Sequence, residues 1–268
     1  EMELTLFLRW CSATQVVAVT GTRGKSTTAT ALHAMLCAGN RSAHLAGNMG
    51  LSALEQLNKI QPSDVVVLEM SSWQTEGMVG SDARTSGAIV TNLLPDHLNR
   101  YVSMEAYAAA KAAVLEAQQP GDWAVLPEGP GWGDWFAARA RARVHWVPQR
   151  GAPPGWAQAR LHGDHNRANL AAAAIAAEQL GVTEAAIRSA VRTFPGVPQR
   201  QQFLGTVGNV RVFNDTTATI PDATLAALDT ILGPWVLIAG GSDKGLDYEK
   251  LAKRLDRDPC VRALVLLP

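Results

Sequence analysis

The chain has 268 residues, 47% of them hydrophobic and 18% charged, a length that allows one large domain or two ordinary ones. Lysine plus arginine equals aspartate plus glutamate at 24 each, so overall charge gives no support for a nucleic-acid-binding surface. Three cysteines are too few for a disulfide framework and lack the spacing of a zinc site. The most apolar stretches, such as residues 168–177, are well short of the ~20 residues that a membrane helix needs. We therefore expect a cytoplasmic protein without nucleic-acid or membrane partners.

Short β-branched runs alternate with helix-forming segments along the chain, which is typical of a parallel sheet with crossover helices. Several runs are apolar at consecutive positions, as expected for strands covered on both faces. The expected strands are 16–20, 65–69, 88–92, 123–126, 144–147, 210–214, 235–239 and 263–267. The expected helices are 27–38, 104–118, 166–180, 221–231 and 248–255. The sequence therefore predicts the α/β fold class.

Two prolines and a glycine end a helical pattern at Phe194-Pro195-Gly196-Val197-Pro198, which predicts domains at 1–196 and 197–268. The Pro-, Gly- and Trp-rich region 119–155 is expected to be an irregular peripheral excursion between two strands, without a chemical role. The first residues read like the interior of a longer chain, and the last ones like a strand with nothing after it. We therefore expect the sequence to be part of a longer protein.

The segment Thr20-Gly21-Thr22-Arg23-Gly24-Lys25-Ser26-Thr27 lies between an apolar strand and an alanine-rich helix. Such an arrangement turns backbone N–H groups toward one point and is typical of a phosphate site. Lys25 would supply charge to the phosphates, and Ser26 a hydroxyl to Mg²⁺. The alternative is a glycine turn that caps a helix, but chance would rarely combine both glycines, Lys-Ser and these two elements.

Polar residues follow two further expected strands, at the edge where open parallel sheets bind ligands. Glu69 ends one strand, where a carboxylate suits a nucleotide-bound Mg²⁺. The pair Asp96-His97 follows the other. Taken alone, His97 is more often a capping or packing histidine, but its place beside a phosphate loop favours function. Lys111 stands among alanines, and this spacing alone predicts that it lies on the solvent-exposed face of a helix.

Nine segments of the chain, in order and over nearly its whole length, resemble the Mur ligase family, in particular the members that join D-glutamate to UDP-N-acetylmuramoyl-L-alanine. These segments are TGTRGKSTT, AGNMG, LEMSSWQTE, TNLLPDHLNRY, MEAYAAAK, GDHNRANLAAAA, FPGVPQR, VFNDTTAT and IAGGSDKGLDY. The resemblance implies ATP-dependent amide formation through an acyl phosphate in peptidoglycan precursor synthesis. It also implies a P-loop ATPase-like central domain and a partial Rossmann-like C-terminal domain. The family's N-terminal uridine-binding domain and the end of its C-terminal domain would lie outside this sequence.

The resemblance also implies roles for individual residues. Lys25, His97 and Lys111 would be catalytic, and two Mg²⁺ ions would be held by Ser26, Glu69, His97 and Lys111, the last as a carbamate. A carbamate needs an unprotonated amine, so burial would have to lower the pKa of Lys111. The ATP-binding set would be Gly21, Thr22, Arg23, Gly24, Lys25, Ser26, Thr27, Asn166, Asn169, Arg200 and Asp215. The muramoyl substrate would contact Asn48, Ser71 and Gln74, and D-glutamate would contact Thr219 and Lys244.

One position departs from the family pattern. Many members carry NDSKAT where this chain has Asn214-Asp215-Thr216-Thr217-Ala218-Thr219, so Thr217 replaces a usual lysine and does not support a choice of amino acid. The alternatives are a folylpolyglutamate synthase, a muramoyl ligase for another amino acid, or a nucleotide-binding module without ligase activity. A nucleic-acid motor is disfavoured by the balanced charge. We expect the protein to act as a monomer.

Overall fold

The computed structural model describes residues 2–48, 52–242 and 246–267. The chain divides into two compact units, Glu1–Pro195 and Gly196–Pro268. This division falls inside the Pro-Gly segment at which the sequence predicts a boundary.

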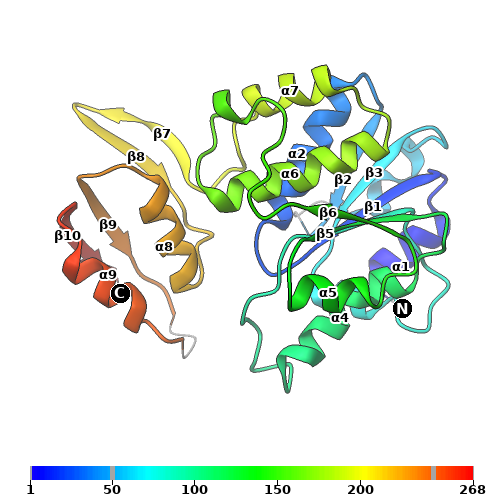
Figure 1. The fold of residues 1–268 in the computed structure, drawn as a ribbon, viewed down its shortest axis with the longest axis horizontal. Helices are drawn as coiled ribbons and strands as arrows, with labels where there is room; N and C mark the ends of the chain where they lie inside the picture. Colours follow the sequence, from blue (N-terminus) through cyan, green and yellow to red (C-terminus); the bar gives the residue numbers. More distant parts are fainter. Residues whose placement is uncertain (1, 49–51, 243–245, 268) are drawn as a thin grey trace. The chain divides into compact units, whose positions relative to one another are not determined.

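The first unit is built on a six-stranded sheet (Figure 1), whose strand pairs are all parallel. Its spatial order is β2 (Ala43–Gly47), β3 (Val65–Glu69), β1 (Gln15–Thr20), β4 (Gly87–Val90), β5 (Trp123–Pro127) and β6 (Arg143–Val147). The strand that leads into the glycine loop, β1, therefore lies between β3 and β4. The predicted α/β class with a parallel sheet is confirmed.

Helices cover both faces of this sheet (Figure 1). On one face lie α2 (Lys25–Ala38), α6 (Asp164–Gln179) and α7 (Glu184–Thr193), which contact one another. On the other lie α1 (Glu3–Trp10), α4 (Met104–Glu116) and α5 (Trp132–Ala137), with the short α3 (Ser72–Glu76) against α4. Two 3₁₀ turns, η1 (Leu54–Lys59) and η2 (Trp156–Gln158), complete the unit.

The core explains why these segments become strands and helices. Residues Val65 to Leu68 are all 0% exposed, as expected for a strand covered on both faces. On the α1–α4–α5 side, Phe7, Leu115 and Phe136 lie in the same buried cluster as Leu68. The alanines of α6 lack long side chains, and this lets α6 lie close to α2.

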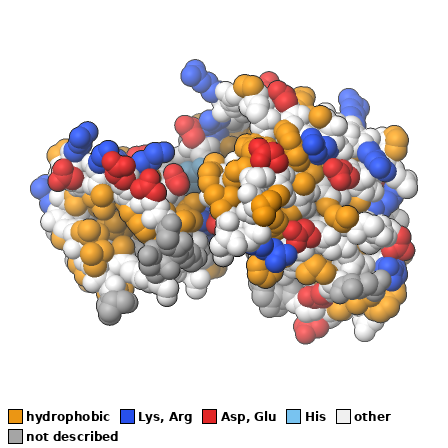
Figure 2. Space-filling view, turned by 90° about the horizontal axis from the view of Figure 1, so that it is seen from below, with side chains coloured by type: hydrophobic (Ala, Val, Ile, Leu, Met, Phe, Trp, Pro, Cys, Tyr) orange, Lys and Arg blue, Asp and Glu red, His pale blue; other side chains and the backbone are white. Residues whose placement is uncertain are grey.

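The second unit contains two small sheets. Strands β7 (Gln202–Val207) and β8 (Val210–Asn214) form an antiparallel hairpin, and β9 (Trp235–Ala239) pairs with β10 (Val261–Leu266) in parallel. Helices α8 (Pro221–Thr230) and α9 (Glu249–Arg257) contact each other. Many apolar side chains of this unit are exposed (Figure 2), among them Phe203, Leu204 and Ile238.

Several sequence expectations are corrected by the structure. The strand expected at 88–92 ends at Val90, and residues 91 and 92 continue as a loop. The region 119–155 contains the two expected strands, now β5 and β6, but the segment between them is not irregular throughout, because α5 connects them in a regular crossover unit. The elements α1, α3, α5, α7, β2 and β7 were not expected from the sequence. The segment of β2, AHLAG, has no β-branched residue, and its parallel pairing with β3 makes it a strand.

Among the described residues, no helix combines the length and the apolar composition needed to cross a membrane.

Candidate phosphate-binding and catalytic site

Four neighbouring strands deliver polar residues to one edge of the main sheet. The order β2-β3-β1-β4 brings together the carboxyl ends of these strands. Asn48 follows β2, Glu69 ends β3, the glycine loop follows β1, and Thr91 with Asn92 follows β4. Ligands bind in open parallel sheets at this edge, so the strand order itself places the candidate site.

The glycine loop needs glycine at two positions. Gly24, the residue before α2, has a φ of 83°, and a Cβ there would lie 2.1 Å from Oδ1 of Asn169. Gly21 has a φ of 138°, and its Cβ would lie 2.0 Å from Oγ1 of Thr91. Both residues therefore combine a left-handed backbone with a close neighbour, which only glycine accepts. The loop leads directly into the N-terminus of α2, whose backbone N–H groups favour anions.

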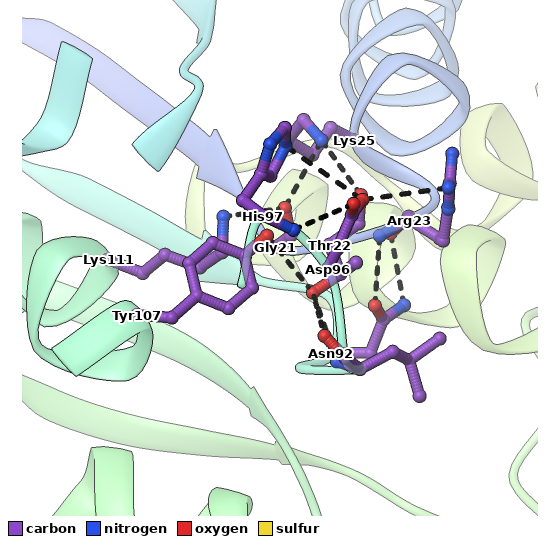
Figure 3. A network of polar contacts seen from close by, with 10 residues as sticks. Gly21, Thr22, Arg23, Lys25, Asn92, Asp96, His97, Tyr107 and Lys111 are labelled. Atoms are coloured by element: carbon purple, nitrogen blue, oxygen red, sulfur yellow. Dashed lines mark hydrogen bonds and ion pairs between the residues drawn. The ribbon is translucent and has the colours of Figure 1, made fainter. Parts of the chain in front are cut away.

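Two lysines converge on one carbonyl oxygen of this loop (Figure 3). Nζ of Lys25 donates to the oxygens of Gly21 and Thr22 at 3.2 and 2.9 Å, and Nζ of Lys111 donates to the oxygen of Gly21 at 2.9 Å. Lys111 is 1% exposed. Burial, and then repulsion by Lys25, lower the pKa of Lys111 to about 7, although Asp96 opposes the shift. The expectation from spacing alone, a solvated helix stripe, is therefore wrong for Lys111.

Tyr107, which lies on α4 as Lys111 does, contacts both the glycine loop and Lys111. Nζ of Lys111 is 4.5 Å from the centre of its ring, and Oγ1 of Thr22 donates to its hydroxyl at 3.3 Å. The imidazole of His97 meets the same ring edge-on, with centroids 6.0 Å apart. Burial raises the pKa of Tyr107 to about 12, so the phenol stays protonated at neutral pH. Sequence analysis did not select Tyr107, and the signal for it was its place one helical turn before Lys111.

His97 and Arg23 both approach Asp96. Nε2 of His97 is 3.8 Å from Oδ2 of Asp96, and the guanidinium of Arg23 is 3.6 Å from the same oxygen. The backbone N–H of His97 donates to Oδ1 of Asp96 at 2.9 Å. His97 has a φ of 54°, a left-handed conformation that is uncommon for non-glycine residues, although histidine adopts it more readily than most.

Glu69 presents a buried carboxylate at the end of β3. It is 2% exposed, and its Oε1 accepts from Nδ2 of Asn48 at 3.4 Å. Its Oε2 is buried and has no hydrogen-bond partner among the residues that the structure describes, a state that is costly unless something else binds that oxygen. Gly47 lets the end of β2 lie close to the end of β3, because a Cβ at Gly47 would lie 2.2 Å from the backbone oxygen of Glu69.

Ser71 and Gln74 contact each other at the start of α3. The N–H of Ser71 donates to Oε1 of Gln74 at 2.8 Å, and the N–H of Gln74 donates to Oγ of Ser71 at 3.3 Å. This reciprocal pair is a capping box, which orients the first turn of the helix. Their observed contacts are therefore structural, and their role toward a substrate remains a prediction.

The remaining predicted residues divide between the two units. Asn169 packs against Gly24, whereas Nδ2 of Asn166 donates to the backbone oxygen of His162 at 2.9 Å. Ser26 and Thr27 are buried in the first turn of α2. Arg200, Asp215 and Thr219 belong to the second unit, and Lys244 lies outside the described residues.

Asp215 is a buried titrating group of the second unit whose pKa is shifted by its surroundings. Burial raises its pKa, while the N–H of Gln201, which donates to Oδ1 at 3.0 Å, and the charge of Arg200 oppose the shift. In the part of the chain that the structure describes, no group of three His, Cys, Asp or Glu side chains is arranged to hold a metal ion. A metal at the loop would therefore depend on hydroxyl, modified-lysine or ligand oxygens as well.

The parallel sheet and the strand–glycine loop–helix unit with its lysine define a protein with a P-loop-type fold, a class in which this loop binds phosphate. The Mur ligase middle domain matches residues 19–152. UDP-N-acetylmuramoylalanine–D-glutamate ligases from Roseiflexus sp. and Symbiobacterium thermophilum are 39% and 36% identical to this chain, over 100% and 99% of its length. The chain belongs to the Mur ligase family. It spans 63% and 62% of the length of these two relatives.

Solved structures show the same fold. MurF ligase from Thermotoga maritima, in complex with ADP, superposes with a TM-score of 0.75 at 20% identity over 98% of this chain and 72% of that one. MurF from Acinetobacter baumannii superposes with a TM-score of 0.76 at 18% identity, over 94% of this chain and 63% of that one.

Proposed function

We propose that this chain is the catalytic part of an ATP-dependent ligase that joins D-glutamate to UDP-N-acetylmuramoyl-L-alanine through an acyl phosphate. The observation that carries the proposal is the convergence of Lys25 and buried Lys111 on the oxygen of Gly21, at the sheet edge that also bears Glu69. A simple nucleotide-binding module has no need for a second buried lysine there. The names of the relatives at 39% and 36% identity support D-glutamate as the amino acid.

In this proposal residues 1–196 bind ATP and residues 197–268 contribute to amino-acid binding. The backbone of Gly21 to Thr27 and the ammonium of Lys25 would hold the phosphates, since helix N-termini and lysines stabilise negative charge. The other nucleotide contacts would come from Asn166, Asn169, Arg200 and Asp215. Asn48, Ser71 and Gln74 would contact the muramoyl substrate, and Thr219 and Lys244 the D-glutamate.

The donors at the sheet edge fit a nucleotide that carries Mg²⁺. The buried Oε2 of Glu69, to which no described residue donates a hydrogen bond, is the kind of hard oxygen ligand that this ion prefers. We propose Ser26 and Glu69 as the residues for one ion, and His97 with a carbamate of Lys111 for a second. When bound, these ions would neutralise charge on the phosphoryl group and the acyl oxygen.

The surroundings of Lys111 fit carbamate formation. With a pKa near 7, part of its population is the free amine at neutral pH, and only the free amine attacks CO₂. The nitrogen lone pair forms the new N–C bond while one C=O π bond of CO₂ opens and its electron pair moves to oxygen, and the nitrogen then loses one proton to solvent. The lysine thereby changes from a cation into an anion with two oxygens.

The proposed reaction has two displacement steps. The carboxylate of the muramoyl substrate attacks the γ-phosphorus of ATP, the bond to the bridging oxygen breaks, and ADP leaves. The amine of D-glutamate then attacks the acyl carbon and loses a proton, and phosphate leaves with the electron pair of the C–O bond. Lys25 would stabilise charge on the phosphates, and His97 would help to polarise the acyl group. Positioning and electrostatics carry most of such a transfer.

The test is an assay of phosphate release with UDP-N-acetylmuramoyl-L-alanine, ATP and Mg²⁺, in which D-glutamate is compared with L-glutamate, L-lysine and glycine. The assay is run on this chain and on the longest protein encoded by the open reading frame that contains it. For the longer protein we expect phosphate release that depends on D-glutamate, together with an equal amount of the amide product. Release that depends on another amino acid would overturn the substrate assignment, and release independent of any amino acid would overturn ligation.

A further inference from the structure

The side-chain amide of Asn92, just past the end of β4, binds both the backbone N–H and the backbone oxygen of one residue of the phosphate loop, Arg23. The backbone N–H of Arg23 donates to Oδ1 of Asn92 at 3.0 Å, and Nδ2 of Asn92 donates to the backbone oxygen of Arg23 at 3.0 Å. Figure 3 shows these two contacts side by side. The side-chain amide therefore pairs with Arg23 as a neighbouring strand would.

Thr91 reinforces the same attachment. Its Oγ1 donates to the oxygen of Arg23 at 2.6 Å, so this carbonyl accepts two hydrogen bonds from the continuation of β4. The backbone N–H of Thr22 donates to the oxygen of Asn92 at 3.0 Å. Two successive loop residues are thus fixed to two successive residues after β4.

These contacts set the direction of a backbone donor at the start of α2. The peptide between Arg23 and Gly24 is trans, so the N–H of Gly24 points away from the side to which the oxygen of Arg23 points. That oxygen is held toward Thr91 and Asn92. The N–H of Gly24 is consequently held toward the opposite side, at the N-terminus of α2, where a phosphate is expected.

We propose that Asn92 is a positioning residue of the phosphate loop, assisted by Thr91, and that it acts by fixing the Arg23-Gly24 peptide rather than by touching the nucleotide. This role rests on the proposed function, because it presupposes that the loop binds nucleotide phosphates. Pre-organised donors bind an anion without first paying the entropy of ordering the loop. Without Asn92, part of the loop population would turn this donor away from the ligand.

The experiment compares the wild-type chain with Asn92→Ala, Asn92→Asp, Thr91→Val and Thr91→Ser by calorimetric titration with ADP and with AMP. A melting curve without nucleotide is recorded for each. Gln118→Ala is the matched control, because the amide of Gln118 is also buried and donates to backbone oxygens, those of Thr85 and Trp123, at the opposite ends of β4 and β5.

We expect Asn92→Ala to weaken ADP binding about tenfold or more, as the loss of two backbone hydrogen bonds implies. AMP, with one phosphate, should lose less, so the ratio of the AMP to the ADP dissociation constant should fall. Asn92→Asp keeps the acceptor and loses the donor to the oxygen of Arg23, and it should weaken ADP binding at least as much. Thr91→Val should also weaken it, and Thr91→Ser, which retains the hydroxyl, should restore it. Gln118→Ala should lower the melting temperature and leave ADP affinity unchanged.

Two results would overturn the inference in distinguishable ways. If the wild-type chain binds ADP and the Asn92 and Thr91 variants bind it equally well, Asn92 is merely structural and the proposed function survives. If the wild-type chain binds neither ADP nor ATP, the proposed function fails and this role fails with it. Should Asn92→Ala not fold, Thr91→Val and Thr91→Ser decide the question, because the first change is nearly isosteric and the second removes only a methyl group.

Discussion

Lys25 and Lys111 donate hydrogen bonds to the same acceptor, the backbone oxygen of Gly21, from helices on opposite faces of the sheet. Two ammonium groups that share one acceptor repel each other, and the buried one loses its proton more easily. The repulsion by Lys25 is accordingly the second cause, after burial, of the lowered pKa of Lys111. The phosphate loop and the helix that carries Lys111 are thereby coupled electrostatically.

Replacement of Lys25 by alanine should weaken binding of ATP by about tenfold or more, since a charge-assisted contact to phosphate is lost. The fold should persist, because the hydrogen bonds that Lys25 donates at 3.2 and 2.9 Å go to backbone oxygens of its own loop, Gly21 and Thr22, and tie no other element of the fold. Titration calorimetry and a thermal melt measure the two effects separately. Lys59→Ala, at the exposed end of η1, is the control and should bind ATP normally. Normal ATP affinity in Lys25→Ala would remove this residue from the phosphate site.

Lys111 should make the stability of the protein depend on pH between about 7 and 10.5. Its pKa is lowered from 10.5 to about 7 on folding, so in this range the unfolded chain binds more protons than the folded one. The free energy of unfolding therefore rises with pH across this range, and this contribution is lost as the pH falls through 7. Lys111→Met removes the titrating amine. The slope of unfolding free energy against pH should therefore be lower in this variant than in the wild type, by up to ~1.4 kcal/mol per pH unit. Urea unfolding of both proteins in CO₂-free buffer from pH 6.5 to 9.5 measures the difference. Parallel pH profiles would contradict a lysine that becomes neutral near pH 7.

The proposed carbamate predicts a chemical rescue. Lys111→Ala should nearly eliminate ligation in the polypeptide that carries the full activity, and a short carboxylic acid such as acetate should partly restore it by supplying the missing oxygens. Acetate should have no such effect on Lys25→Ala, which removes a different group. Full wild-type activity in rigorously CO₂-free buffer would exclude the carbamate.

Glycine at position 47 should be required for a steric reason beyond its backbone angle. Gly47 has a φ of 101°, and its Cβ would lie 2.2 Å from the backbone oxygen of Glu69, whereas Gly181 has a φ of 79° and its Cβ would have no atom of the described chain in contact within 4 Å. Gly181→Ala should therefore cost only the backbone strain, about 1 kcal/mol of unfolding free energy. Gly47→Ala should cost clearly more, about 3 kcal/mol, because backbone atoms have to move as well. Urea denaturation measures the unfolding free energy of both variants. Equal losses of unfolding free energy would show that the ends of β2 and β3 adapt to the added Cβ without strain.

The sequence alone was sufficient where the signal is local. The order strand, glycine loop, Lys25 and helix is contained in about twenty consecutive residues, so the sequence predicts the structure of the loop, and the structure has that order. Longer segments of strong preference, such as β3 and α6, were likewise expected within one or two residues at each end. Glu69 was correctly placed at a strand end, because a run of apolar β-branched residues stops there.

Tertiary structure decided whatever depends on pairing between distant segments. No local pattern states that β1 lies between β3 and β4, and that order brings Asn92 against Arg23, 69 positions away. Likewise, an alanine-rich helix has almost no polar face, so its sequence does not show which side is buried. Only the packing of α4 against the loop took Lys111 out of water, and the loss of hydration, together with the charge of Lys25, is what shifts its pKa. The sequence by itself therefore determined which groups are present, and tertiary structure decided which of them share an environment.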